Sequence, residues 1–362
     1  MTRQRSMMLS ATILAAGIGL AGAPAAAFDG WHLESATTIE GKGSAWDYLT
    51  FDAATNRLFI GHRKEGLQVF DVVAKRLIAT VATTAEASSN GAVLIPEFDL
   101  GVSNNENGTL TPFKLSTLAA LPPIKLGEEL DTSHYDPATK RIIVNMAPGS
   151  DGTELIVLEA PSLRQVGTVK VATKKPEHGE ADGKGLFFMA ARDNERVYRI
   201  DMRTLQVTGE WPTPGCGQTN SLALDAANKR LMLGCRGNAQ VKPSFAVMDA
   251  ENGKIIFTAE VGGGNDGVIY DAELRRIFLT NGVNAVMHVF EQASADSYRP
   301  VEALGTHAGV RSLAIDPKTK KIYAVTAEGS ADFAKRVTTS VSPWYANSFF
   351  ANSFKVLVYG KN

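Results

Sequence analysis

The sequence predicts an all-β fold: a seven-bladed β-propeller in a single domain that spans residues 28–362. Three observations lead to this prediction. Short runs of alternating apolar and polar residues, rich in Val, Ile, Tyr and Phe, are separated by Gly, Pro, Asn and Asp, as in β-hairpins. One sequence unit recurs about every 44 residues. No convincing amphipathic helix follows the N-terminal segment.

The N-terminal segment has the pattern of an export signal. Arg3 and Arg5 precede an apolar stretch over residues 7–22, and three alanines at 25–27 supply a small-residue cleavage site. This order predicts a signal peptide over residues 1–27, removed before Phe28. A membrane anchor is the alternative, but the apolar run is short and interrupted by glycines. No later stretch is long and apolar enough to span a bilayer, so we expect a periplasmic or secreted protein.

The recurring unit is an Asp-containing turn followed by a basic residue and an apolar run. Two long gaps between clear copies each contain a degenerate copy, over residues 91–102 and from Gly179 onward, which gives seven units in total. A unit of about 40–45 residues with four short strands has the size of one propeller blade. The clear copies are FDAATNRLFI at Phe51, YDPATKRIIV at Tyr135, LDAANKRLML at Leu224, YDAELRRIFL at Tyr270 and IDPKTKKIYA at Ile315.

The last unit, from Val310, offers three strands, while residues 31–40 form a strand pattern that belongs to no unit. Pairing this N-terminal strand with the last three would complete blade 7 and cover two exposed sheet edges. We therefore predict a closed ring in which blade 7 is built from both ends of the chain.

The units resemble the YVTN β-propeller repeat, and the chain is similar to the YncE-like family of exported bacterial seven-bladed propellers. Phrases such as MDAENGKIIFTAEVG at Met248 and IDPKTKKIYAVT at Ile315 carry the resemblance, which covers nearly all of residues 28–362. It implies an exported propeller. The family includes members reported to bind single-stranded DNA and many without a known activity. These motifs specify blades and say little about chemistry.

Polar residues stand at the starts of the predicted inner strands, five residues before each turn Asp. Inner strands line the central channel, so these residues predict a ring of polar groups at one channel mouth. The alternative is that Asp and Asn there only satisfy backbone groups of turns. The degenerate units offer Asn90 or Gly91 and, counted from Glu180, Lys175. The clear units place Asp47, Asp131, Asn220, Asp266 and Arg311 there.

Blade 7 carries an insertion at about residues 328–354, where blade 1 has only residues 62–66. The insertion contains Phe333, Trp344 and Tyr345 together with basic residues. Loops of this length in a compact domain are typically functional or disordered. We predict a lid or recognition arm over the polar ring; an aromatic plug that only stabilises the ring is the alternative.

Three residues suggest a metal or acid–base site at the mouth: His178, Glu180 and His307. No tight histidine spacing supports such a site, and isolated loop histidines are the alternative. A metal ion at the mouth therefore stays open. No other cofactor and no catalytic residue are predicted.

Cys216 and Cys235 flank the first hairpin of blade 5. Straight pairing across this hairpin leaves them about four residues out of register, beyond disulfide reach. Gly215 and Gly217 could fold the segment back, and an oxidising compartment favours a bond. The disulfide stays an open prediction.

The charge balance limits the partners. With 37 Lys and Arg against 38 Asp and Glu, the chain lacks the basic excess of a generic polyanion binder. We predict a non-catalytic, monomeric binding module that presents the channel mouth to a protein, peptide or small ligand. One alternative is a metal-assisted hydrolase or lactonase. The other is a single-stranded DNA binder that uses aromatics beside basic residues.

Overall fold

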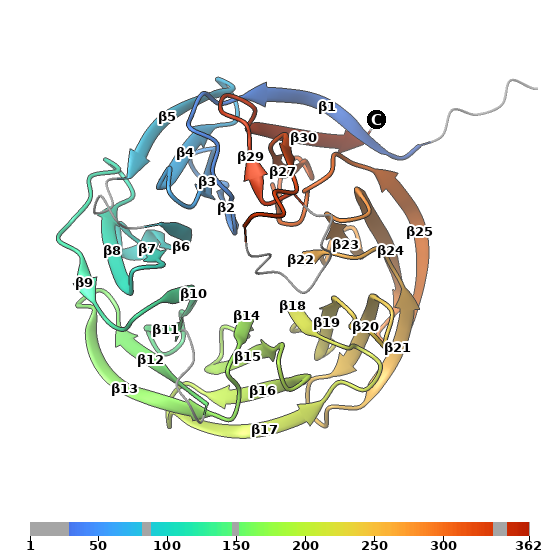
Figure 1. Cartoon of the computed structure of the whole chain (residues 1–362). Helices are drawn as coiled ribbons and strands as arrows, with labels where there is room; N and C mark the ends of the chain where they lie inside the picture. The colour runs from blue at the N-terminus through green and yellow to red at the C-terminus, as the bar shows by residue number, and fades with distance from the viewer. Residues whose placement is uncertain (1–28, 82–87, 147–151, 336–345, 362) are drawn as a thin grey trace, which may run out of the picture.

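The computed structural model describes residues 29–81, 88–146, 152–335 and 346–361. Seven four-stranded antiparallel sheets surround a central channel (Figure 1). The predicted all-β, seven-bladed propeller is therefore confirmed. The predicted signal peptide over residues 1–27 lies outside the described residues. Within those residues, no helix has the length and apolar character to cross a membrane.

The blades follow one another in chain order, with each first strand innermost (Figure 1). Blade 1 contains β2 (Leu49–Asp52), β3 (Arg57–Gly61), β4 (Leu67–Asp71) and β5 (Arg76–Val81). Blade 2 contains β6 (Ser89–Ile95), β7 (Leu100–Asn105), β8 (Thr109–Lys114) and β9 (Ile124–Lys125), with the 3₁₀ turn η1 (Pro96–Phe98) after its first strand. Blade 3 contains β10 (Leu130–Asp136), β11 (Arg141–Met146), β12 (Thr153–Glu159) and β13 (Arg164–Val171).

The next three blades have the same plan. Blade 4 contains β14 (Pro176–Ala181), β15 (Leu186–Ala191), β16 (Arg196–Asp201) and β17 (Gln206–Pro212). Blade 5 contains β18 (Thr219–Asp225), β19 (Arg230–Cys235), β20 (Ser244–Asp249) and β21 (Ile255–Glu260). Blade 6 contains β22 (Asn265–Asp271), β23 (Arg276–Asn281), β24 (Val286–Ser294) and β25 (Ser297–Gly305).

The recurring Asp closes the turn between the first two strands of a blade. In blade 3, both carboxylate contacts run to Thr139: its backbone N–H and its hydroxyl donate to Asp136 at 3.0 and 2.6 Å. Four blades later, in blade 7, Asp316 accepts the Thr319 hydroxyl in the same way, at 2.6 Å. Such Asx turns are a standard role of Asp. The repeated motif is therefore a hairpin signal, which is why it reports architecture and not chemistry.

Blade 7 joins both ends of the chain. It contains β26 (Leu313–Ile315), β27 (Ile322–Thr326), β30 (Lys355–Lys361) and β1 (Trp31–Thr38). Strand β1 pairs antiparallel with β30, from Trp31 opposite Lys361 to Thr38 opposite Lys355. The Trp31 ring also packs edge-on against Phe278 of blade 6, with ring centroids 5.0 Å apart. The predicted closure by the N-terminal strand is confirmed.

The hydrophobic core is divided among the interfaces between neighbouring blades. One cluster combines Phe188 of blade 4 with Leu222, Leu231 and Leu233 of blade 5, all nearly inaccessible to solvent. The apolar residues that follow the polar strand starts, such as Leu222, belong to these interfaces. Packing between blades therefore fixes the direction of each inner strand and the position of its polar start.

The structure contains the Cys216–Cys235 disulfide that the sequence left open, with the two Cα atoms 4.9 Å apart. The chain reaches this position by folding back, since Gly217 has φ +74° and lies so close to Gly237 that a Cβ would meet its Cα at 2.7 Å. A register shift in the β18–β19 pairing after Thr219 helps to realign the strand. The distance predicted from straight hairpin pairing, beyond disulfide reach, was therefore wrong.

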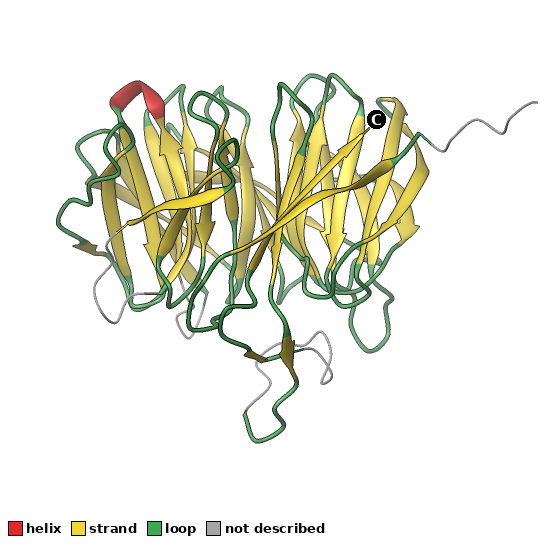
Figure 2. Ribbon diagram, turned by 90° about the horizontal axis from the view of Figure 1, so that it is seen from above, coloured by secondary structure: helices red, strands yellow, loops and turns green. Residues whose placement is uncertain are grey.

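The blade 7 insertion forms an arm that projects from one face of the ring (Figure 2). Its described part contains the short strands β28 (Gly329–Ser330) and β29 (Ser348–Phe349), which pair with each other. Phe349 anchors the base, because its ring lies 5.0 Å from that of buried Trp46. Trp344 and Tyr345, both predicted arm residues, lie outside the described residues.

Candidate functional site

The starts of the seven inner strands meet at the face from which the arm projects. Each places one polar residue at the channel mouth, and we call this set the mouth ring. Six of the seven are at least 90% buried. The mouth ring consists of Asp47, Asn90, Asp131, Glu177, Asn220, Asp266 and Arg311.

The five mouth-ring residues predicted from the clear units thus lie together, and Asn90 takes the place in blade 2. In blade 4 the residue is Glu177, not Lys175. The reason is the turn: Asp182 accepts the backbone N–H groups of Lys184 and Leu186, both at 2.8 Å, and is therefore the true counterpart of the turn Asp. Counting from Glu180 displaced the prediction by two residues.

Asp266 is the most connected member of the mouth ring. It forms ion pairs with Arg236 and with Arg311, the latter at 3.0 Å, and accepts a hydrogen bond from the Asn220 side chain at 2.7 Å. Arg311 also lies 3.8 Å from Asp47, which is paired in turn with Arg63. These contacts connect blades 5, 6, 7 and 1 in sequence around the mouth.

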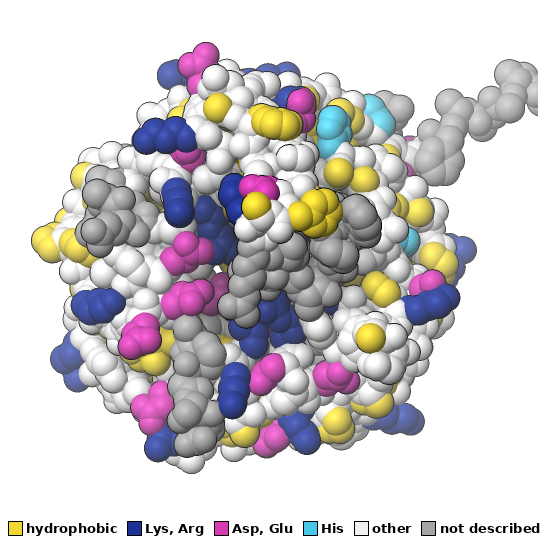
Figure 3. Space-filling model, in the orientation of Figure 1, with side chains coloured by type: hydrophobic (Ala, Val, Ile, Leu, Met, Phe, Trp, Pro, Cys, Tyr) yellow, Lys and Arg dark blue, Asp and Glu magenta, His cyan; other side chains and the backbone are white. Residues whose placement is uncertain are grey.

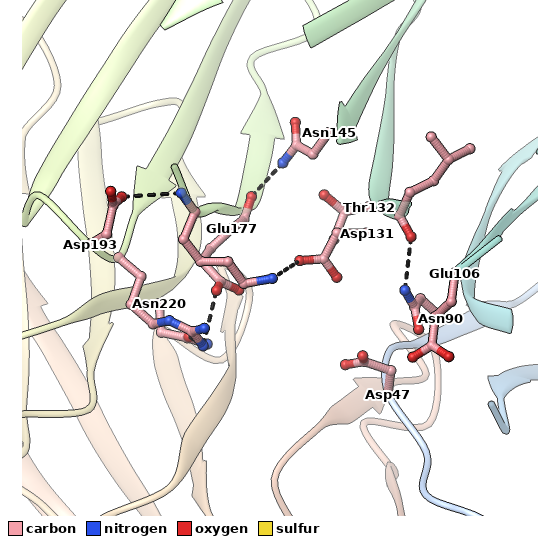
Figure 4. Close-up of polar contacts among 12 residues, drawn as sticks. Asp47, Asn90, Glu106, Asp131, Thr132, Asn145, Glu177, Asp193 and Asn220 are labelled. Carbon is pink, nitrogen blue, oxygen red and sulfur yellow. Dashed lines mark hydrogen bonds and ion pairs between the residues drawn. The ribbon is translucent and has the colours of Figure 1, made fainter. Parts of the chain in front are cut away.

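The other half of the ring is paired as well. Lys175 contacts Asp131 at 3.0 Å, Arg192 contacts Glu177 at 3.0 Å, and Arg63 forms a second ion pair with Glu106 of blade 2. Figure 4 shows Asp47, Asp131 and Glu177 around the same opening. The described charged groups of the mouth are therefore paired with groups of opposite sign, and Figure 3 shows acidic and basic side chains mixed on this face.

Burial acts on the carboxyl groups of the ring in different ways. Burial would raise the pKa of Asp266, but Arg236 and Arg311 outweigh it and lower that pKa, so Asp266 is ionised. Burial raises the pKa of Asp47 in spite of Arg63 and Arg311. Burial also raises the pKa of Glu177 to about 7, although Arg192 and Lys175 oppose the shift. The ring can therefore change its charge near neutral pH at Glu177.

A pocket of about 480 Å³ lies between the arm and the loops of blade 1. Its charged lining consists of Arg63, Lys64, Arg311 and Lys335, with Glu106 as the acidic group. Lys335 belongs to the arm, where its ammonium group donates to the Ser348 hydroxyl at 2.6 Å. Arg63 is already paired with Asp47 and Glu106, and Arg311 with Asp266, so Lys64 and Lys335 are the pocket cations that can meet an acidic group of a partner.

His178 and Glu180 lie deeper, where they line a channel cavity of about 350 Å³. The imidazole Nδ1 of His178 lies 3.1 Å from the Leu222 carbonyl oxygen, and its ring lies 5.7 Å from Tyr48 across the channel. Burial lowers the pKa of His178 to about 4, and burial raises the pKa of Glu180 to about 7. At neutral pH the histidine is uncharged and the glutamate is close to its midpoint.

His307 does not join this pair. It is exposed in the loop that enters blade 7, beside a separate cavity of about 600 Å³ that Glu328 and Phe350 also line. The structure therefore does not bring His178, Glu180 and His307 into one cluster. Across the described parts of the chain, no three His, Cys, Asp or Glu side chains are placed to hold a metal ion.

Sequence reasoning missed the residues that pair with the mouth ring. Arg63, Arg192 and Arg236 occupy similar places in their units, one or two residues after the second strand, and each faces a ring carboxylate. Glu106 has the corresponding place in blade 2. Aligning the units at the second strand, in addition to the turn Asp, would have revealed this row.

Among the described arm residues, Phe333 keeps 65% of its surface exposed.

Comparisons with known proteins identify the fold. No protein-family model matches the sequence, and no curated protein does. A chain of the mitotic checkpoint complex crystal structure superimposes with a TM-score of 0.69 at 12% identity, over 89% of this chain and 95% of that one. A chain of Kuenenia stuttgartiensis hydrazine synthase gives 0.68 at 13% identity, over 84% and 99%. At such identities the likeness shows the fold alone: this chain is a seven-bladed β-propeller.

Proposed function

We propose that the protein is an exported, non-catalytic binding module of the YncE-like, YVTN-repeat type. Its partner is a protein or peptide that places an acidic group in the pocket between the arm and blade 1. The observation that carries the proposal is the lining of this pocket by Arg63, Lys64, Arg311 and Lys335 against Glu106. Propellers commonly serve as protein-interaction modules, which agrees with this assignment.

The arm is an addition that ring closure does not need. Strands β27 and β30 pair directly, from Ile322 opposite Tyr359 to Thr326 opposite Lys355. The two ends of the arm already lie together, because the Glu328 N–H donates to the Ser353 hydroxyl at 3.1 Å. A segment that the blade does not require, placed beside a cationic pocket, supports a role in recognition.

The two alternatives have less support. For a metal-assisted hydrolase, His307 lies apart from His178 and Glu180, in a different cavity. For single-stranded DNA, the chain has no basic excess, with 37 Lys and Arg against 38 Asp and Glu, and the basic groups Lys175 and Arg236 each contact a carboxylate. The positions of the histidines do not favour a hydrolase, and the paired basic groups do not favour DNA binding, over recognition of an acidic partner.

The test compares the chain over residues 28–362 with a variant that lacks residues 330–352. Each is used to capture partners from a periplasmic extract, and a recovered partner is then titrated in purified form by calorimetry. We expect the deletion to abolish binding while the thermal unfolding transition is retained. Equal binding by both proteins contradicts the role of the arm.

A charge variant tests the pocket separately. Lys64 is exposed and lines the pocket, and Lys184 is an exposed lysine in a turn at the opposite end of an inner strand. We expect Lys64→Glu to weaken binding about tenfold and Lys184→Glu to leave it unchanged. Affinity should also fall as salt increases, since the interaction is electrostatic. An equal effect of both variants would mean that the acidic group binds elsewhere.

A further inference from the structure

The channel below the mouth ring contains a cavity that the proposed function does not use. Its volume is about 350 Å³, and inner strands of all seven blades contribute to its wall. No Lys or Arg lines it, and its two acidic groups are Asp266 and Glu180. Arg236 and Arg311 neutralise Asp266 from the mouth side. The charge inside the cavity is therefore set by Glu180.

Two polar groups in the cavity wall lack protein partners. The Glu180 carboxylate has no hydrogen-bond donor or cation among the residues that the structure describes, and burial raises its pKa to about 7. Across the channel in blade 7, the Ser312 hydroxyl also has no partner, although Ser312 is 98% buried. Buried hydroxyl groups are normally hydrogen-bonded, so the unpaired Ser312 hydroxyl, together with a Glu180 carboxylate that is half-buried and open to the same cavity, indicates a missing ligand.

The remaining wall suits an organic cation. The aromatic rings of Tyr48 and His178 lie 5.7 Å apart, and His134 packs edge-on against His178 at 5.0 Å. Both imidazoles are uncharged at neutral pH, because burial lowers the pKa of His178 to about 4 and that of His134 well below its ordinary value. A protonated amine would thus meet one carboxylate, aromatic faces and no competing positive charge.

We propose that the channel cavity binds a small primary amine in its ammonium form, with the ammonium group on Glu180 and a second polar group on Ser312. A cavity of this volume accepts a ligand of roughly ten non-hydrogen atoms. The site is independent of the acidic partner proposed for the mouth face, so either proposal can fail without the other.

The test is calorimetric titration of the chain over residues 28–362 with 4-amino-1-butanol and with tyramine, each at pH 8. Butyrate serves as the anionic control and Zn²⁺ as the metal control. We expect both amines to bind and butyrate not to bind. Glu180→Gln should weaken amine binding at least tenfold and Ser312→Ala severalfold, while Glu260→Gln on the outer strand β21 should have no effect.

The pH dependence provides a second readout that needs no variant. Affinity should rise roughly tenfold from pH 6 to pH 8, as Glu180 ionises around pH 7 while the amine stays protonated. The other titratable groups of the wall do not titrate there: burial raises the pKa of Tyr48, and the pKa values of His178 and Asp266 are lowered, as is that of His134, which packs against His178. Glu177, whose pKa is also about 7, lies in the mouth ring outside this wall, and Glu180→Gln should remove the pH dependence.

Three results would overturn the proposal: no amine binding at 10 mM (a concentration about ten-thousandfold above micromolar affinity), amine binding that Glu180→Gln leaves unchanged, or tight binding of Zn²⁺ in place of the amines. If Glu180→Gln does not fold, the pH dependence of amine affinity is measured on the unmodified protein instead. An affinity that does not change between pH 6 and pH 8 then contradicts the proposed site.

Discussion

Asp266 shows that one buried side chain can connect several blades of the ring. Its buried carboxylate accepts the Asn220 amide and pairs with Arg236 and Arg311, so it connects three blades. Removing one partner of a buried ion pair leaves uncompensated charge, which is strongly destabilising. We expect Asp266→Asn to lower the free energy of unfolding by about 3–5 kcal/mol in urea titrations.

The matched control is Glu260→Gln. Glu260 pairs with Lys242 at 2.9 Å, but both side chains are largely exposed, and such pairs contribute at most about 1 kcal/mol. Equal effects of the two substitutions would mean that the mouth ring does not hold the blades together.

Glu180 should make stability depend on pH. Its folded-state pKa of about 7 lies above its ordinary value, so the native state binds the proton more tightly than the unfolded chain. The stabilising effect of the protonated group is complete below about pH 4.5 and is lost as the pH rises through 7. Relative to the native chain, Glu180→Gln should therefore gain about 2 kcal/mol between pH 5 and pH 8. Urea unfolding of both proteins at the two pH values measures this gain, and a difference independent of pH would contradict the shifted pKa.

At the scale of the element, the disulfide ties the entry of β18 to the end of β19. The two cysteines are separated by 19 residues. Closing a loop of this length in the unfolded chain stabilises the native state by about 3 kcal/mol in the loop-entropy description. We expect replacement of both cysteines by alanine to lower the unfolding free energy by about that amount, with the sheet retained in circular dichroism. Loss of blade 5 packing instead would show that the cysteines act mainly through the core.

The elements also show what sequence reasoning could and could not predict. The turn Asp residues, such as Asp136, gave the blades and the starts of the inner strands, because local hydrogen bonds define those turns. The pairing of Arg236 with Asp266 could not be predicted in this way, since it joins different blades. The predicted distance between Cys216 and Cys235 was wrong, because a regular hairpin count includes neither a register shift nor glycines with positive φ.

At the scale of the whole molecule, closure depends on β1. This strand covers β30 along its length and adds the contact of Trp31 with Phe278. Deleting residues 28–38 should expose β30 as an edge strand, which invites pairing with a second chain. We expect the truncated protein to elute as oligomers in size-exclusion chromatography and to unfold at a lower temperature. Addition of a peptide that spans Trp31–Thr38 should restore the monomer; oligomers that persist with saturating peptide would assign their formation to another surface.

The pairing of β1 with β30 also orders events during biosynthesis. Strand β1 is synthesised first, but its partner β30 lies near the other end of the chain. Blades 1 to 6 can therefore form before blade 7 is complete. Until β30 has been synthesised, β1 has no partner strand and the ring is not closed at blade 7. Ring closure is therefore the last step of folding, and a ribosome-bound chain that lacks β30 cannot complete it.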